Sequence, residues 1–387
     1  MNRFEIKGWC PSALRPMASG DGLVVRLRPR GGRLSSAQAS RIADLSTRYG
    51  NGLIDLTGRA NLQIRGVVAE SLEALIEALA RLGVIDADAE TESRRNILVA
   101  PFWSEGDETP SLAAELERAL ATSSLGLPEK FGFAVDCGAE RVLAQTPADI
   151  RIERGAQGGL LVRADGAREG RAVISAEAID VALALARWFT ASGGVRDGRG
   201  RMAAYIASGA TPPDAMAANA KPSPAVVLPR PGLYAAGALI GLAFGQMRSQ
   251  TLGYLADLAP GLRMTPWRMI LAEAACEMPR HEDVVTRADD PLLRVVACTG
   301  APSCPEAHAQ TRVLATALAP HIGAGKRLHV SGCAKGCAHP GPSTITLVGT
   351  ANGFDLVRQG STRDRPALQG LDPAEILSDV DALMGAS

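Results

Sequence analysis

Four cysteines near the C-terminal end of the chain have a spacing that suits metal ligation. Five residues separate Cys298 from Cys304, and three separate Cys333 from Cys337. Four thiolates are the usual ligands of a 4Fe–4S cluster, whereas structural zinc sites typically leave about two to four residues between paired ligands. The longer gap is awkward for zinc, so the pattern favours an iron–sulfur cluster, with zinc or ordinary thiols as the alternatives.

The residues around these cysteines are consistent with loops that wrap a cluster. Cys298 ends an apolar run, and Pro305 after Cys304 predicts a helix start, which would place that thiolate at a helix N-terminus. Gly332 and Gly336 would let the backbone bend closely around sulfide. An odd total of seven cysteines argues against a disulfide framework. We expect the other three to be ordinary thiols: Cys10, Cys137 and Cys276.

Two segments near the N-terminus carry alternating basic residues. In residues 56–66, polar and apolar side chains alternate, so a strand would place Arg59, Gln63 and Arg65 on one face. Arginine binds carboxylates bidentately, so this face predicts an anionic partner, and a merely solvated sheet face is the alternative. The second segment alternates in the same way through Arg26, Arg28 and Arg30, and further basic residues follow at Arg94, Arg95 and Lys130.

The elements that would position these residues are repeated along the chain. Residues 22–66 and 232–273 both predict a strand, a helix and a strand. Each unit is followed by a longer one, over 94–189 and 292–384, that predicts a strand, a helix, a strand, a hairpin and a closing helix. We therefore predict a duplicated α+β protein with pseudo-two-fold symmetry, built from antiparallel sheets covered by helices. Chance agreement of two α+β domains is the alternative.

The repeat also predicts the domain boundaries. We expect a half-domain, a larger α+β domain, a linker rich in Pro and Ala, a second half-domain, and a larger domain that carries the four cysteines. These span residues 1–75, 90–207, 208–224, 225–285 and 290–387. A metal site in only one of two related halves predicts a cofactor that lies between them and is bound by both.

Bulk composition excludes several classes of protein. The 387 residues allow two or more domains. Lys+Arg and Asp+Glu both total 41, and aromatic residues make up 4%, so neither the basic excess nor the stacking residues of a nucleic-acid binder are present. We find no secretory h-region and no apolar stretch long enough for a bilayer, which predicts a cytoplasmic protein without a membrane partner.

Taken together, these motifs resemble the nitrite and sulfite reductase superfamily over nearly the whole chain. The resemblance rests on the cysteine spacing and on two segments, Thr57-x-Arg59 with Gln63, and Arg95-Asn96. It implies two ferredoxin-like half-domains and two larger α+β domains. It also implies that the cysteines hold a 4Fe–4S cluster, that the last of them touches the siroheme iron in the reductases, and that the two segments meet tetrapyrrole carboxylates.

Within that superfamily, residues 8–29, 54–66, 264–268 and 331–349 look most like the precorrin-3B synthases of the aerobic cobalamin pathway. Those enzymes place an oxygen from dioxygen on precorrin-3A and close a γ-lactone. The resemblance implies a monooxygenase-type oxidoreductase that uses precorrin-3A, dioxygen and an external electron donor. The expected substrate-binding residues are Arg26, Arg28, Arg59, Gln63, Arg65, Arg95, Asn96 and Lys130, and no catalytic residue is assigned.

One position departs from the reductases, which carry two lysines near their oxyanion. This chain has Lys130 but Gly132 at the second place, which leaves less positive charge to stabilise an oxyanion. A siroheme-dependent sulfite or nitrite reductase is still the main alternative, and a noncatalytic tetrapyrrole carrier or electron-transfer module is another. A mononuclear non-haem iron beside the cluster is also open, with His308 and His339 as candidate ligands.

Overall fold

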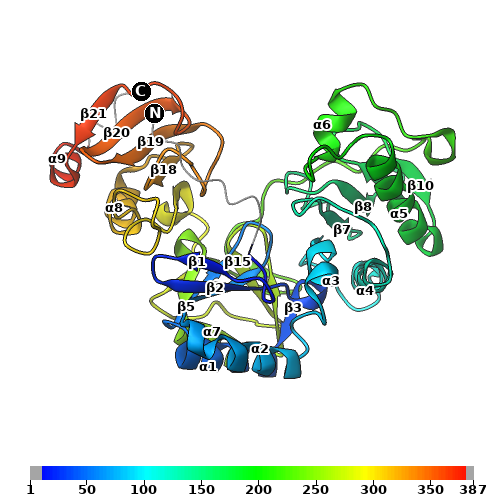
Figure 1. Ribbon diagram of the computed structural model, residues 1–387, viewed down its shortest axis with the longest axis horizontal. Helices are drawn as coiled ribbons and strands as arrows, with labels where there is room; N and C mark the ends of the chain where they lie inside the picture. The colour runs from blue at the N-terminus through cyan, green and yellow to red at the C-terminus, as the bar shows by residue number, and fades with distance from the viewer. Residues whose placement is uncertain (1–10, 381–387) are drawn as a thin grey trace.

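The computed structural model describes residues 11–380 and arranges them in three lobes (Figure 1). A central lobe lies at the bottom of the view. The lobe on the right contains β6–β10, and the lobe on the left contains β17–β21 and the C-terminal helix. The two outer lobes rise from opposite sides of the central one, so that loops of both face its upper surface.

Two related sheets form the central lobe, and each contains one strand from the other half. The first has the order β1-β2-β5-β4-β13, and the second has the order β11-β12-β15-β14-β3 with β16 paired to β12. Strand β3 therefore joins the second sheet, and β13 joins the first. Because each half completes the sheet of the other, the halves form one structural unit. The strands are β1(Met17–Ser19), β2(Gly22–Leu27), β3(Arg33–Ser35), β4(Leu53–Leu56), β5(Leu62–Val67), β11(Gly232–Tyr234), β12(Gly237–Leu242), β13(Gln246–Arg248), β14(Gly261–Met264), β15(Met269–Glu273) and β16(Val284–Val285).

Helices cover the lower side of these sheets (Figure 1). Helix α1(Ser36–Tyr49) begins at Ser35, whose side chain accepts from the amide of Gln38 while the Gln38 side chain bonds back to the Ser35 amide. This capping box satisfies two otherwise unpaired amides. Helix α7(Ser249–Leu258) is the counterpart of α1 in the second half, and α2(Leu72–Arg81) extends the layer.

The two outer lobes share one sheet topology. Their strand orders are β10-β9-β8-β7-β6 and β17-β18-β19-β20-β21. Each sheet contains three parallel strands, which are β6, β7 and β8 in one sheet and β17, β18 and β19 in the other. The remaining strand pairs are antiparallel. The strands are β6(Ile97–Val99), β7(Phe133–Asp136), β8(Ile150–Arg154), β9(Leu160–Ala164), β10(Arg171–Val173), β17(Val295–Ala297), β18(Leu328–Ser331), β19(Ser343–Thr350), β20(Gly353–Gly360) and β21(Leu368–Leu371).

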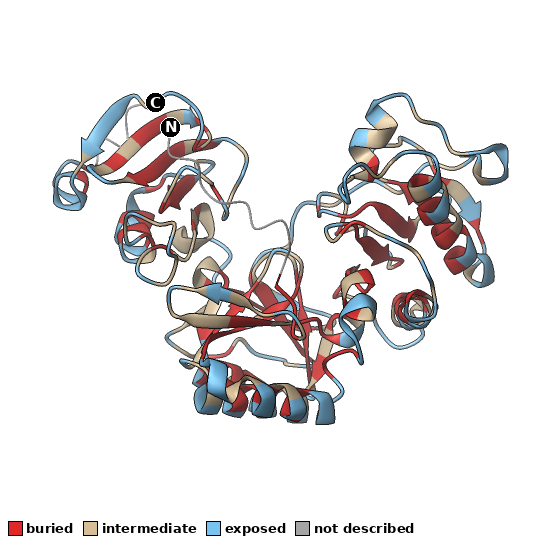
Figure 2. Cartoon of the chain, viewed as in Figure 1, coloured by how far each residue is buried: buried red, intermediate tan, exposed pale blue. Residues whose placement is uncertain are grey.

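Helices pack on the sheets of the outer lobes, and the buried apolar side chains of residues 11–380 form three large clusters and one small one. Figure 2 shows the strands largely buried and the outer faces of the helices exposed. The helices are α3(Ala89–Arg94), α4(Glu108–Ala121), α5(Ser175–Ala191), α6(Met202–Ala207), α8(Arg312–Leu318) and α9(Pro373–Ser378). Among the residues that the structure describes, no helix is both long and apolar enough to cross a bilayer.

The duplicated α+β fold predicted from the sequence is confirmed, with three local corrections. The sheets of the outer lobes are mixed and not purely antiparallel. Residues 53–66 form a hairpin of β4 and β5 instead of one strand, so Arg59 and Arg65 do not share a strand face. The expected linker over 208–224 packs along the right-hand lobe, where Gly170 donates to the carbonyl of Ala220 at 2.9 Å.

Candidate cluster and tetrapyrrole site

Two adjacent parallel strands deliver the four cysteines to one edge of the left-hand sheet. Cys298 follows β17 directly, and Cys333 follows β18 after one residue. Parallel neighbours end at the same edge of a sheet, so the loops after them meet. The amide of Gly332 donates to the Cys298 sulfur at 3.2 Å, and the amide of His308 donates to the Gly332 carbonyl at 2.8 Å. The two loops therefore form one continuous thiol-lined site.

The thiols are close enough to affect one another's ionisation. Burial raises the pKa of the Cys337 thiol, although the residue as a whole is exposed, and Cys333, Cys298 and Cys304 raise it further, whereas Lys335 lowers it. Burial likewise raises the pKa of Cys333. Thiols whose pKa is raised in this way require a nearby cation to hold them as thiolates. The donor set therefore fits a 4Fe–4S cluster.

A single metal ion has less support within residues 11–380. No group of three or more His, Cys, Asp or Glu side chains in that range is arranged to hold one ion. The thiols of a 4Fe–4S cluster each bind a different iron, so they do not converge on one point. Of the candidate histidines, His339 lies against the carbonyl of Pro342 at 3.2 Å and packs edge to face on the buried His329 at 5.9 Å between centroids.

The glycines of the second loop are required by close packing against neighbouring residues. A Cβ on Gly332 would lie 2.6 Å from that of Ala307, and one on Gly336, which has φ of 64°, would lie 2.7 Å from Thr362 Oγ1. The predicted helix after Cys304 is wrong. The amide of Cys304 instead bonds the Gly300 carbonyl in a turn at 2.8 Å, and helix α8 begins only at Arg312.

Both halves of the central lobe contact the cysteine loops. The turn between β1 and β2 meets the first loop, because Ser19 Oγ and the Gly20 amide donate to the Ser303 carbonyl at 2.6 and 3.0 Å. The hairpin of β14 and β15 meets the second loop, because Arg268 Nη2 donates to the Ala338 carbonyl at 3.0 Å. The central lobe therefore fixes the position of the cysteine site from two sides.

The β4–β5 hairpin places Arg59 at its tip, toward the right-hand lobe. Thr57 Oγ1 accepts from the amides of Arg59 and Asn61 at 3.3 and 3.2 Å, and Ala60 adopts a left-handed φ of 56°. Arg59 Nη2 donates to the carbonyl of Lys130 at 3.0 Å, and the Lys130 side chain is exposed. Two of the predicted substrate residues are thus brought together by the tight turn.

Arg26 and Gln63 form a second group on neighbouring strands. They face each other across β2 and β5. With the Gln63 amide in the orientation that satisfies both residues, its oxygen accepts from Arg26 Nε and Nη2 at 3.2 and 3.0 Å. Both side chains are only half-buried.

The other predicted arginines lie inside the protein with acidic partners. Arg65 pairs with Asp21 at 2.7 Å and Asp55 at 3.2 Å. Arg95 pairs with Asp86 at 2.9 Å and lies 3.8 Å from Glu117. These arginines were expected to present a basic face, but they neutralise buried carboxylates. Asn96 also has an internal contact, since its Nδ2 donates to the Phe131 carbonyl at 2.9 Å.

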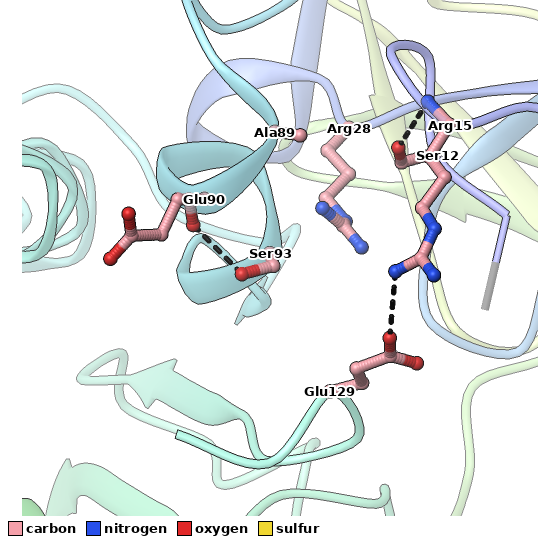
Figure 3. Close-up of a pocket in the computed structure, with 7 residues that line it drawn as sticks. All are labelled: Ser12, Arg15, Arg28, Ala89, Glu90, Ser93 and Glu129. Atoms are coloured by element: carbon pink, nitrogen blue, oxygen red, sulfur yellow. Dashed lines mark hydrogen bonds and ion pairs between the residues drawn. The ribbon is translucent and has the colours of Figure 1, made fainter. Parts of the chain in front are cut away.

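A cavity of about 260 Å³ lies where the central lobe meets α3 and the loop before Lys130 (Figure 3). Arg28 lines it but donates to the carbonyl of Glu92, so this arginine is also engaged internally. Arg15 reaches across the cavity to Glu129 at 3.5 Å, and its side chain is 61% exposed. Sequence reasoning missed Arg15 as a candidate because it precedes the predicted strand, outside any periodic pattern.

Gly132 occupies a position with no room for a side chain. A Cβ there would lie 2.8 Å from Asn96 Nδ2 and 3.0 Å from the Asn96 carbonyl oxygen. Its amide also donates to Asp149 Oδ2 at 3.0 Å. The absence of the second lysine therefore lowers the positive charge here and also follows from the packing, because a lysine at this point would displace Asn96.

Comparison with known proteins finds similarity to a reductase half-domain, to a precorrin-3B synthase and to nitrite reductases. The model of the nitrite/sulfite reductase ferredoxin-like half domain matches residues 15–82. A precorrin-3B synthase from Sinorhizobium sp is 29% identical over 93% of this chain and 84% of the relative. A ferredoxin–nitrite reductase from Synechococcus elongatus is 30% identical, but over 40% of this chain and 32% of the relative.

A solved structure extends the likeness to the whole fold. The NirA protein of Mycobacterium tuberculosis superposes with a TM-score of 0.68 at 18% identity, covering 93% of this chain and 79% of that one. The half-domain match, the long sequence relationship and this fold agree with one another. The chain is a homologue of a precorrin-3B synthase over most of its length, and its residues 15–82 match the nitrite/sulfite reductase ferredoxin-like half domain.

Proposed function

We propose that this protein is an oxygen-dependent precorrin-3B synthase that hydroxylates precorrin-3A and closes a γ-lactone on it. The observation that carries the proposal is the extent of the sequence relationship. The precorrin-3B synthase relative matches 93% of the chain, whereas the two nitrite reductase relatives match 40% and 33%. A shared scaffold accounts for the similarity to the synthase and for the similarity to the nitrite reductases. The similarity to the synthase extends over more of the chain and therefore favours that function.

The reaction requires electrons from outside the protein. One atom of dioxygen enters the ring, and the other leaves as water after taking two electrons and two protons from a reductant. A 4Fe–4S cluster on Cys298, Cys304, Cys333 and Cys337 would supply single-electron transfer to the ring site. The protein's own part is to hold the thiolates in place through the Gly332 amide and to support the loops from the central lobe.

Tetrapyrrole carboxylates would bind where basic side chains can still be reached by a ligand. Arg59 and Lys130 meet at the junction of the central and right-hand lobes, and Arg26 lies on the same sheet beside Gln63. Guanidinium groups form bidentate hydrogen bonds with carboxylates, so they would orient a ring that carries many carboxylates. Arg28, Arg65 and Arg95 would act indirectly, because their internal partners keep the surrounding backbone in place.

The packing at Gly132 counts against the reductase alternative. An oxyanion being reduced needs fixed cations near its developing charge. Here the backbone lies against Asn96 with no space for a second lysine, whereas neutral dioxygen needs no such charge. The ring can therefore be the substrate that is oxidised and not the carrier of a catalytic iron.

The absorption spectrum of the purified protein tests this assignment. We expect broad iron–sulfur absorbance without an intense siroheme band, and saturable changes on titration with precorrin-3A. A stoichiometric siroheme band together with sulfite or nitrite turnover would replace the synthase proposal with the reductase. A protein with neither iron nor acid-labile sulfide after anaerobic purification would overturn both.

A further inference from the structure

Arg268 occupies the tip of the β14–β15 hairpin in a backbone conformation that an arginine rarely adopts. Its φ is 61°, and Ala60 at the equivalent tip of the first half has φ of 56°. The two tips are built alike, because the Thr57 amide bonds the Asn61 carbonyl at 2.9 Å and the Thr265 amide bonds the Met269 carbonyl at 3.1 Å. A bulky side chain in the left-handed region is strained, and such residues persist where they have a function.

The side chain of Arg268 extends from this tip to the cysteine loop. Its Nη2 donates to the carbonyl of Ala338, the residue after Cys337. Its stem packs against Gly245, whose missing Cβ would lie 3.0 Å from Arg268 Cγ. Ala60, at the equivalent place in the first half, is too short for any such contact. The second half thus differs from the first by a long cation aimed at the cluster domain.

Among residues 11–380, Arg268 has no carboxylate within ion-pair distance. Burial lowers the pKa of its guanidinium to about 10, with Arg312 and Arg327 adding to the effect and Asp55 opposing it. Asp55 is already paired with Arg65 at 3.2 Å and with Arg312 at 3.5 Å. A cation that is only partly exposed to water and has no counterion is unfavourable. This arrangement therefore calls for an anion that residues 11–380 do not supply.

We propose that Arg268 is a positioning residue whose charge stabilises the reduced state of the cluster on Cys337 and its partner cysteines. The inference rests on the cluster of the proposed function. Four thiolates around the cluster give it a net negative charge, which would be the missing counterion. Reduction adds another negative charge, so a nearby fixed cation favours the reduced form and raises the reduction potential.

The test compares the cluster's midpoint potential in the parent protein and in three variants, by redox titration monitored with electron paramagnetic resonance. Arg268→Gln removes the charge and keeps a hydrogen-bond donor for the Ala338 carbonyl. Arg268→Lys keeps the charge. Arg248→Gln is the control, because Arg248 is an exposed arginine paired with Glu282 and Asp283 in another region.

We expect Arg268→Gln to disfavour one-electron reduction about tenfold, a fall of about 59 mV in potential, with iron content unchanged. Arg268→Lys and Arg248→Gln should stay near the parent value. If Arg268→Gln cannot retain the cluster, the test rests on Arg268→Lys. That variant must then retain the cluster and have the midpoint potential of the parent protein.

Two results would overturn the inference. One is an unchanged potential in Arg268→Gln with a full cluster, and if precorrin-3A binding is also weaker, Arg268 is a ring ligand instead. The other is a fall in the potential of Arg268→Lys as large as in Arg268→Gln. A parent protein that holds no cluster would instead refute the proposed function, so the two failures can be told apart.

Discussion

Arg65 and Glu273 occupy equivalent positions in the two halves of the central lobe and carry opposite charges. The hairpin registers relate them, because Leu56 pairs with Leu62 in the first half as Met264 pairs with Ile270 in the second. Arg65 bonds Asp55 at 3.2 Å.

The partner of Glu273 at the matching place is Arg263, at 2.7 Å. Each half therefore keeps one ion pair across its hairpin, but the cation and the anion have exchanged strands. Burial alone would raise the pKa of Glu273, yet hydrogen bonds from Arg33 and Arg263 hold it below its ordinary value. Glu273 is thus charged at neutral pH beside Arg263.

Breaking the first pair should destabilise the fold. Arg65→Ala would leave Asp55 and Asp21 with a buried, uncompensated charge, because the Arg65 side chain is only 6% exposed. Removing one partner of a buried pair costs about 3–5 kcal/mol. Chemical denaturation should show a loss in that range, whereas Arg81→Ala, which breaks an exposed pair with Glu77, should cost under about 1 kcal/mol. Equal losses would contradict the structural role of Arg65.

The cysteine assignment predicts a clear separation between two groups of thiols. Alanine at Cys298, Cys304, Cys333 or Cys337 should remove most iron and acid-labile sulfide, because three thiolates leave one iron corner open to oxidation. Cys276→Ala is the matched control, since Cys276 is an exposed thiol outside the cysteine loops. Analysis of iron and sulfide after anaerobic purification decides the point, and full iron in Cys333→Ala would refute the ligand set.

Ring binding should depend on Arg59, the partly exposed basic residue at the tip of the first hairpin. Arg59→Ala should weaken precorrin-3A binding by about 1.5–3 kcal/mol, the range for hydrogen bonds to charged groups, without changing iron content. Equilibrium titration measures the loss. Arg41→Ala on α1 should bind normally, because its side chain faces solvent beside Asp44. Equal affinity in both variants would mean that Arg59 only braces the Lys130 loop.

Packing at Gly132 makes a prediction about the lysine that the reductases carry. Gly132→Ala should cost about 1–3 kcal/mol of stability, since its Cβ would press on Asn96. Gly126→Ala is the control, because its Cβ would meet nothing within 4 Å. If thermal unfolding of the two variants is the same, Asn96 gives way easily and the backbone argument against a second lysine fails.

Several features of this molecule could be predicted from local sequence patterns. The repeated order of elements predicted the duplicated α+β fold, since the apolar spacing of a helix and a strand is set within each segment. The glycines beside Cys333 and Cys337 predicted tight loops, because the freedom of a glycine backbone is also a local property. Such signals depend on neighbours in the chain.

Features that depend on distant partners could not be predicted in this way. The exchange of β3 and β13 between sheets leaves no local signal. Alternation across residues 56–66 suggested one strand, because nothing in the pattern indicates the left-handed turn at Ala60. Arg65 and Arg95 looked available for a ligand until Asp55 and Asp86 were found beside them.

The central claim is that dioxygen supplies an atom to the tetrapyrrole ring. The direct measurement is mass spectrometry of the product formed from precorrin-3A and reductant under isotopically labelled dioxygen, with an anaerobic reaction as the control. We predict one labelled oxygen in the product, formed only in the presence of dioxygen and lost in Cys337→Ala. An unlabelled product, or turnover that continues without dioxygen, would contradict the account.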